Sequence, residues 1–291
     1  MMPALPLGSR AAAATKVASA TRSSVISQRL GNFLRWRRFM PLPIAAPMTT
    51  DTIEAAERLT AIRDSMDRAA RLTGRTADDI TLIAISKMQG SDAIRPLIEA
   101  GQRIFGENRV QEAQGKWPAL REEFPDLALH LVGQLQSNKA IDAVALFDVI
   151  HSLDRPSLLT ALARAMDAAD RRIPCYVQVN IGAEEQKGGC AIAEVPTLIK
   201  AARAADIPLL GLMCVPPAGI EPAPFFALLA KMAREEGLAR LSMGMSGDYE
   251  TAIMLGATDI RVGTALFGER PSPARPIPAS GRGMIRNSRA G

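Results

Sequence analysis

A lysine at the end of an apolar run is the residue of this sequence best suited to covalent chemistry. Lys87 directly follows residues 80–86, whose side chains are almost wholly apolar. A lysine that leaves a buried strand is partly desolvated, which favours the neutral amine that a Schiff base requires. The alternative is a lysine that simply turns into solvent, so its companion residues must decide between the two interpretations.

Two segments rich in glycine and hydroxyl residues, 242–248 and 261–264, are the second signal. Small residues let backbone N–H groups approach a phosphate, although glycine and serine are also ordinary turn residues. Each segment alone is weak evidence. A Schiff-base lysine combined with a phosphate site indicates a pocket for pyridoxal 5′-phosphate.

Other polar residues near these segments have two interpretations each. Arg261 lies among apolar or small neighbours. It could face the cofactor's ring nitrogen, disfavour protonation there and weaken the cofactor as an electron sink, or it could form a salt bridge with an acid such as Glu107. Asn108 could bind the cofactor or cap the following helix. His151 is expected to be a satisfied histidine at the rim rather than a base that faces the ligand.

These residues follow short apolar runs that alternate with segments of helical composition. The runs predicted as strands are 80–86, 103–107, 128–133, 147–153, 174–180, 208–214, 239–245 and 259–263. Predicted helices include 52–73, capped by Thr50 or Asp51, and 91–100, 155–169, 191–204, 222–236 and 248–255.

Strands that are apolar on both faces and separated by helices indicate a parallel sheet. Eight such units match a single β/α (TIM-type) barrel, whose strand ends would bring Lys87 and both glycine-rich segments to one mouth. An open doubly wound sheet is the alternative, but no Gly-x-Gly-x-x-Gly follows the first run.

The amino-acid composition argues against several classes of function. The two histidines and three cysteines have no metal-type spacing, which argues against a histidine-based triad, a zinc site and a disulfide framework. Residues 51–269 hold all 30 acids but only 23 bases, a net charge of −7 that argues against a nucleic-acid-binding surface. No apolar run approaches the roughly 20 residues of a membrane span. We therefore expect a cytoplasmic protein that binds neither nucleic acid nor membrane.

The two ends of the chain differ from the middle. Residues 1–47 contain seven bases and no acid, which is typical of a mitochondrial transit peptide but also fits an upstream start with Met48 as the true first residue. Residues 270–291 contain five arginines and no acid, and we expect a disordered tail. The folded domain is predicted over 48–269.

Several stretches together resemble one family, the pyridoxal phosphate homeostasis proteins (the YggS/PROSC-type pyridoxal phosphate-binding proteins), over about residues 51–269. The stretches are LIAISK at 82–87, FGEN at 105–108 with VQE at 110–112, LQSNK at 135–139, VNI at 179–181 with KGG at 187–189, GLM at 211–213, LSMGMS at 241–246 and RVGTA at 261–265. Some residues depart from the family pattern, such as Met88-Gln89 and Arg109. They lie beside the matching stretches, at the expected rim of the barrel, and concern any contact with a partner there.

The resemblance implies a barrel like the N-terminal domain of alanine racemase, with Lys87 as the Schiff-base lysine. It implies that Ser246, Gly263 and Thr264 surround the phosphate, that Arg261 lies near the ring nitrogen, and that Asn108 and Met213 line the pocket. It also implies a monomer that buffers or delivers pyridoxal 5′-phosphate in vitamin B6 homeostasis without established catalysis, with apo-enzymes that need this cofactor as possible recipients.

An amino-acid racemase is the alternative function. Two-base racemisation needs a second proton-transfer group opposite the lysine, which in the alanine racemase fold is a tyrosine on a separate C-terminal domain. This sequence contains only Tyr176 and Tyr249, and we expect only a tail after the barrel. The carrier is therefore the favoured hypothesis.

Overall fold

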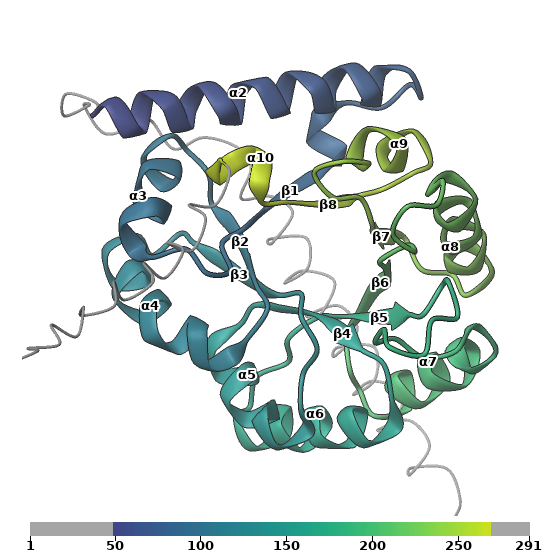
Figure 1. Ribbon diagram of the computed structural model, residues 1–291. Coiled ribbons are helices and arrows are strands. Elements are labelled where there is room, and N and C mark those ends of the chain that lie inside the picture. The colour runs from purple at the N-terminus through teal and green to yellow at the C-terminus, as the bar shows by residue number, and fades with distance from the viewer. Residues whose placement is uncertain (1–48, 269–291) are drawn as a thin grey trace, which may run out of the picture. The chain divides into compact units, whose positions relative to one another are not determined.

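Eight parallel strands close into a barrel in sequence order (Figure 1). The computed structural model describes residues 49–268. The strands are β1 (Thr81–Ile85), β2 (Ile104–Glu107), β3 (Ala128–Leu131), β4 (Val149–Leu153), β5 (Cys175–Val179), β6 (Leu209–Cys214), β7 (Arg240–Ser242) and β8 (Asp259–Val262). All eight predicted strands are confirmed to within three residues at either end. The open-sheet alternative is wrong, because β1 pairs with β8 along Thr81–Ala84.

Helices follow the strands and surround the barrel (Figure 1). They are α2 (Thr50–Arg71), α3 (Ser91–Glu99), α4 (Val110–Glu123), α5 (Ala140–Leu146), α6 (Pro156–Ala168), α7 (Val195–Ala204), α8 (Ala223–Glu235), α9 (Tyr249–Met254) and α10 (Thr264–Phe267), with short 3₁₀ turns η1 (Ala77–Asp79), η2 (Ser137–Lys139) and η3 (Ile192–Glu194). The predictions for residues 1–47 and 270–291 lie outside the described residues.

The helix α2 packs over the seam where the barrel closes. Its cap is Thr49, whose hydroxyl accepts from the Thr52 N–H at 3.2 Å, and not Thr50 or Asp51 as predicted. The reason is that both of those residues already lie inside the first helical turn. The helix contacts α3, α9 and α10, and Arg58 donates from Nε to the Leu266 carbonyl at 2.8 Å. This bond ties α2 to α10, which borders the site described below.

The core has two layers. The larger layer fills the space between strands and helices and includes Phe105, Trp117 and Phe226, all fully buried. A smaller cluster of Val149, Tyr176 and Met213 fills the barrel interior. Strands buried on both faces explain why the apolar runs show little alternation. Within residues 49–268, no helix is both long and apolar enough to cross a membrane.

Candidate cofactor site

A cavity of about 450 Å³ opens at the carboxyl ends of the strands, within the size range of small-molecule sites. Six of the seven predicted site residues line it: Lys87, Asn108, Ser246, Arg261, Gly263 and Thr264. The other lining residues had no predicted role of their own, although Met245 lies in the segment 242–248 that the sequence singled out. They include Ile85, Gln89, Val132, Val215, Met245 and Phe267. Their position in the sequence could have indicated them, because each lies within a few residues of a predicted strand end.

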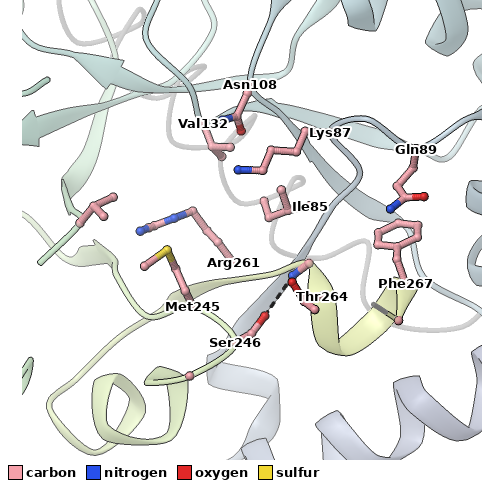
Figure 2. A pocket seen from close by; sticks show the side chains of 14 residues that line it. Ile85, Lys87, Gln89, Asn108, Val132, Met245, Ser246, Arg261, Thr264 and Phe267 are labelled. Atoms are coloured by element: carbon pink, nitrogen blue, oxygen red, sulfur yellow. Dashed lines mark hydrogen bonds between the residues drawn. The ribbon is translucent and has the colours of Figure 1, made fainter. Parts of the chain in front are cut away.

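Lys87 extends from the end of β1 into this cavity. Figure 2 shows its side chain and that of Arg261 reaching into the same space, with Asn108 beside the lysine. Lys87 is half-buried, and it forms no hydrogen bond or ion pair with any other residue between 49 and 268. A half-buried amine without such a partner is available to react with a ligand.

The turn that carries Lys87 is clamped from helix α4. Lys116 donates from Nζ to the carbonyls of Ser86 at 2.8 Å and Gln89 at 2.9 Å. The Met88 N–H donates to Glu112 Oε1, while Met88 itself adopts a positive φ of 62°. The two ends of the turn and its middle are therefore held by side chains of one helix.

A buried ion pair underlies this clamp. Lys116 Nζ lies 2.9 Å from Glu107 Oε1, and the two side chains are 9% and 0% exposed. Glu112 Oε1 lies 3.0 Å from the same ammonium. Burial acts to raise the pKa of Glu112, but hydrogen bonds from Lys116 and the Met88 N–H lower the pKa below its ordinary value. Glu112 and Lys116 are four residues apart on α4, a spacing at which opposite charges on a helix can pair.

Two hydroxyl side chains, those of Ser246 and Thr264, line the cavity after the last two strands, β7 and β8. The Gly263 N–H donates to Ser246 Oγ at 3.4 Å, and Thr264 follows at the start of α10 (Figure 2). Gly263 lies against Ile85 of the neighbouring strand, where an added Cβ would be 3.4 Å from the Ile85 carbonyl oxygen. The cavity lining thus includes an amine, a guanidinium, two hydroxyls and no carboxylate among the described residues. This set of donors fits a small anion that carries a phosphate and an electrophilic carbon.

Arg261 reaches the cavity from β8 and is 5% exposed. It donates from Nη1 to Ser242 Oγ at 2.7 Å and from Nη2 to the Cys214 carbonyl at 2.8 Å. Burial lowers the pKa of this guanidinium, yet arginine remains charged in proteins. The alternative salt bridge with Glu107 is wrong, because Glu107 pairs with Lys116 instead.

Three other sequence-based expectations need correction or refinement. Met213 does not line the cavity but packs inside the barrel with Val149 and Tyr176; Val215, two residues nearer the mouth on the same face, lines it instead. His151 is fully buried in the barrel interior, not at the rim. Asn108 lines the cavity and does not cap α4, whose N-cap position is Arg109.

Residues 58–271 match the model of the family described as alanine racemase, N-terminal domain. Among curated relatives, the pyridoxal phosphate homeostasis protein of Escherichia coli (strain K12) is 38% identical over 229 residues, which cover 75% of this chain and 97% of that protein. The protein of the same name from Aquifex aeolicus is 35% identical, with 75% and 99% covered.

Two solved structures are also similar to this chain. PipY of Synechococcus elongatus, solved with PLP bound, is 39% identical, with a TM-score of 0.63 and coverage of 74% of this chain and 100% of that chain. An alanine racemase from Bartonella henselae with covalently bound pyridoxal phosphate shares the fold at a TM-score of 0.57, with 15% identity and coverage of 78% of this chain and 62% of that chain.

Proposed function

Because this chain belongs to the family of pyridoxal phosphate homeostasis proteins, we propose that it binds pyridoxal 5′-phosphate in the strand-end cavity and holds it for buffering and delivery without catalysis. The observation that carries this proposal is the placement of Lys87. Its half-buried amine faces a cavity lined by Ser246, Gly263 and Thr264, with no partner of its own among the described residues.

The covalent step uses the neutral amine of Lys87. Lys87 would hold the cofactor by condensing with its aldehyde, which would form a carbon–nitrogen double bond and release the aldehyde oxygen and two amine hydrogens as water. The cofactor, when bound, supplies an electron sink for carbanion chemistry. The clamp from Lys116 and Glu112 holds the backbone of the turn at residues 86–89, so the Lys87 side chain starts from a fixed point at the edge of the cavity.

The remaining lining residues have complementary roles in the proposal. The hydroxyls of Ser246 and Thr264 and the N–H groups near Gly263 would bind the phosphate. Arg261 would lie at the ring nitrogen, where a permanent cation disfavours protonation. An unprotonated ring weakens the electron sink and supports storage over chemistry at a substrate carbon.

A racemase function is disfavoured by the position of the tyrosines. Tyr176 is fully buried in the barrel interior, where its hydroxyl donates to Asp259 Oδ2 at 2.7 Å. Tyr249 lies at the start of α9 and does not line the cavity. Among the described lining residues, only Lys87 and Arg261 are ionisable, so the second base of a two-base mechanism is missing from them.

An absorbance titration tests cofactor binding. Adding pyridoxal 5′-phosphate to the purified protein should produce a visible band that borohydride abolishes, with the cofactor then fixed to Lys87 in a peptide mass spectrum. Lys87→Ala should show neither result. Lys200→Ala, which removes an exposed lysine from α7, is the matched control and should behave as wild type. A wild-type protein that stays colourless with excess cofactor would contradict the proposal.

Two further assays separate carrier from racemase. Loaded protein mixed with an apo-enzyme that needs this cofactor should restore that enzyme's activity, and Lys87→Ala protein treated in the same way should not. Circular dichroism over a panel of L-amino acids should show no steady loss of optical activity. Sustained racemisation that disappears in Lys87→Ala would establish the enzyme in place of the carrier.

A further inference from the structure

Four polar side chains form a continuous hydrogen-bonded chain from the cavity into the barrel interior, and we call them the histidine network. Arg261 Nη1 donates to Ser242 Oγ at 2.7 Å. Ser242 Oγ lies 2.9 Å from His151 Nδ1, and His151 Nε2 lies 3.0 Å from His130 Nδ1. All four side chains are at most 5% exposed. The network joins β8, β7, β4 and β3, so it crosses the barrel interior.

The arginine favours one direction for the protons in the network. A guanidinium only donates, so Ser242 Oγ accepts from Arg261 and keeps its own hydrogen for His151 Nδ1. His151 then carries its proton on Nε2 and donates to His130 Nδ1. The reverse order would leave both the Ser242 hydrogen and the His130 Nε2 lone pair without partners. The first order leaves only the His130 Nε2–H unpaired within the described residues, and it is favoured because unpaired buried groups are costly.

Both imidazoles are neutral, and one is locked by stacking. Burial lowers the pKa of His130 to about 4 and lowers that of His151 well below its ordinary value. The His151 ring stacks on Tyr176 with centroids 4.3 Å apart and planes at 21°. Tyr176 is held in turn by Asp259 and Arg240. His151 therefore presents Nδ1 to Ser242 from a fixed position.

This arrangement orients Arg261 without neutralising it. Two of its five N–H donors bind uncharged oxygens, those of Ser242 and Cys214. The others remain for the cavity, which Arg261 lines. A carboxylate in place of the Ser242 hydroxyl would hold the guanidinium equally well but would cancel its charge. A neutral network supplies the same geometry and leaves the positive charge for the ligand.

We propose that Ser242, His151 and His130 are positioning residues that hold the Arg261 guanidinium, as an uncompensated cation, against the ring nitrogen of bound pyridoxal 5′-phosphate. This inference rests on the proposed function for the identity of the ligand. The proton order within the network does not depend on it and is tested first, on the protein without cofactor.

Nitrogen-15 NMR of the imidazoles reads the proton order directly. The chain contains only two histidines, so an untagged sample gives two ring systems. Both rings should show a bare Nδ1 and a protonated Nε2 at neutral pH. In Ser242→Ala, the His151 ring loses its donor to Nδ1, and its tautomer should become mixed. A protonated Nδ1 on His151 in the wild-type protein would overturn the network as described.

Cofactor binding then tests the effect on Arg261. Ser242→Ala should bind pyridoxal 5′-phosphate about tenfold more weakly or worse, since hydrogen bonds to charged groups are of that strength. With nitrogen-15-labelled cofactor, its ring nitrogen should shift towards the protonated form. Ser242→Thr keeps the hydroxyl and should restore both readouts. Ser152→Ala is the matched control, because it removes a fully buried hydroxyl of β4 that has no partner among the described residues.

The outcomes separate this inference from the proposed function. If wild-type protein binds the cofactor but Ser242→Ala matches Ser152→Ala in affinity and ring-nitrogen shift, the positioning role is wrong and the carrier stands. If wild-type protein binds no cofactor, both fall. Unfolding of the apo-proteins separates a structural effect from a loss of binding. Ser242→Ala should lose more stability than Ser152→Ala, because it leaves Arg261 Nη1 and His151 Nδ1 without a hydrogen-bond partner. Relative to its own apo-protein, only Ser242→Ala should also lose stabilisation by added cofactor.

Discussion

Replacing Lys116 with methionine should destabilise the barrel and loosen the turn that carries Lys87. Methionine keeps the apolar length of the side chain but removes the ammonium. The change deletes the ion pair with Glu107 and the hydrogen bonds to the carbonyls of Ser86 and Gln89. Glu107 is fully buried, and its Oε2 already has no partner within the described residues.

The size of the loss follows from what remains around Glu107. Breaking a buried ion pair by removing one partner costs about 3–5 kcal/mol, because a charge stays buried without compensation. Ser86 Oγ and Trp117 Nε1 still donate to Glu107 Oε1 at 2.6 Å and 3.1 Å. We therefore expect the lower end, a fall of about 3 kcal/mol in the free energy of unfolding. Adding Glu107→Gln should recover part of this loss, because no buried charge is left.

Urea unfolding of the apo-protein measures the effect, with a lower midpoint and an unchanged slope as the expected result. Lys139→Met is the control. Lys139 Nζ lies 3.5 Å from Asp142 Oδ2, and the two side chains are 32% and 39% exposed. Loss of this exposed pair should cost less than about 1 kcal/mol. Lys116→Met should also slow the reaction of Lys87 with pyridoxal 5′-phosphate, and Lys139→Met should not. Equal stability losses in the two variants would refute the assignment of the Glu107–Lys116 pair as a buried, stabilising clamp.

Two further predictions concern the barrel itself. Burial holds the His130 pKa at about 4 against an ordinary 6.5, so the unfolded chain takes up a proton first, and stability present above pH 6.5 is lost as the pH falls towards 4. Between about pH 7.5 and about pH 4.5 wild type should lose about 2.5 kcal/mol more than His130→Gln; parallel denaturation curves would contradict this. Gly211→Ala would put a Cβ 1.8 Å from the Arg240 carbonyl oxygen and should cost about 3 kcal/mol. Gly115→Ala, where a Cβ in helix α4 meets nothing within 4 Å, should instead stabilise slightly in the same assay, and a similar loss in both variants would show that crowding at Gly211 is not the cause.

Much of the site could be predicted because parallel β/α units bring their strand ends to one face. Once eight strands were recognised, Lys87 after the first and Gly263 and Thr264 after the last had to meet, whatever the details of packing. Met213 could not be placed in this way. The strand that carries Met213 was predicted correctly. Whether an inward-facing residue near the strand end lines the mouth or fills the interior depends on its height along the strand. The apolar pattern of a strand buried on both faces does not reveal that height.

The sequence alone determined the number and order of the strands, the end of the barrel that carries the cavity, and the lysine that lines it. These features are local: each is encoded in a run of a few residues and its neighbours. Only the tertiary structure decided which polar groups are partners. Glu107 pairs with Lys116 rather than Arg261, and His151 meets Ser242 across the barrel interior. His151 and Ser242 are 91 residues apart in the sequence, and closure of the barrel brings them within hydrogen-bonding distance. Glu107 and Lys116 lie on the consecutive elements β2 and α4, and the packing of that helix on the strand sets their contact.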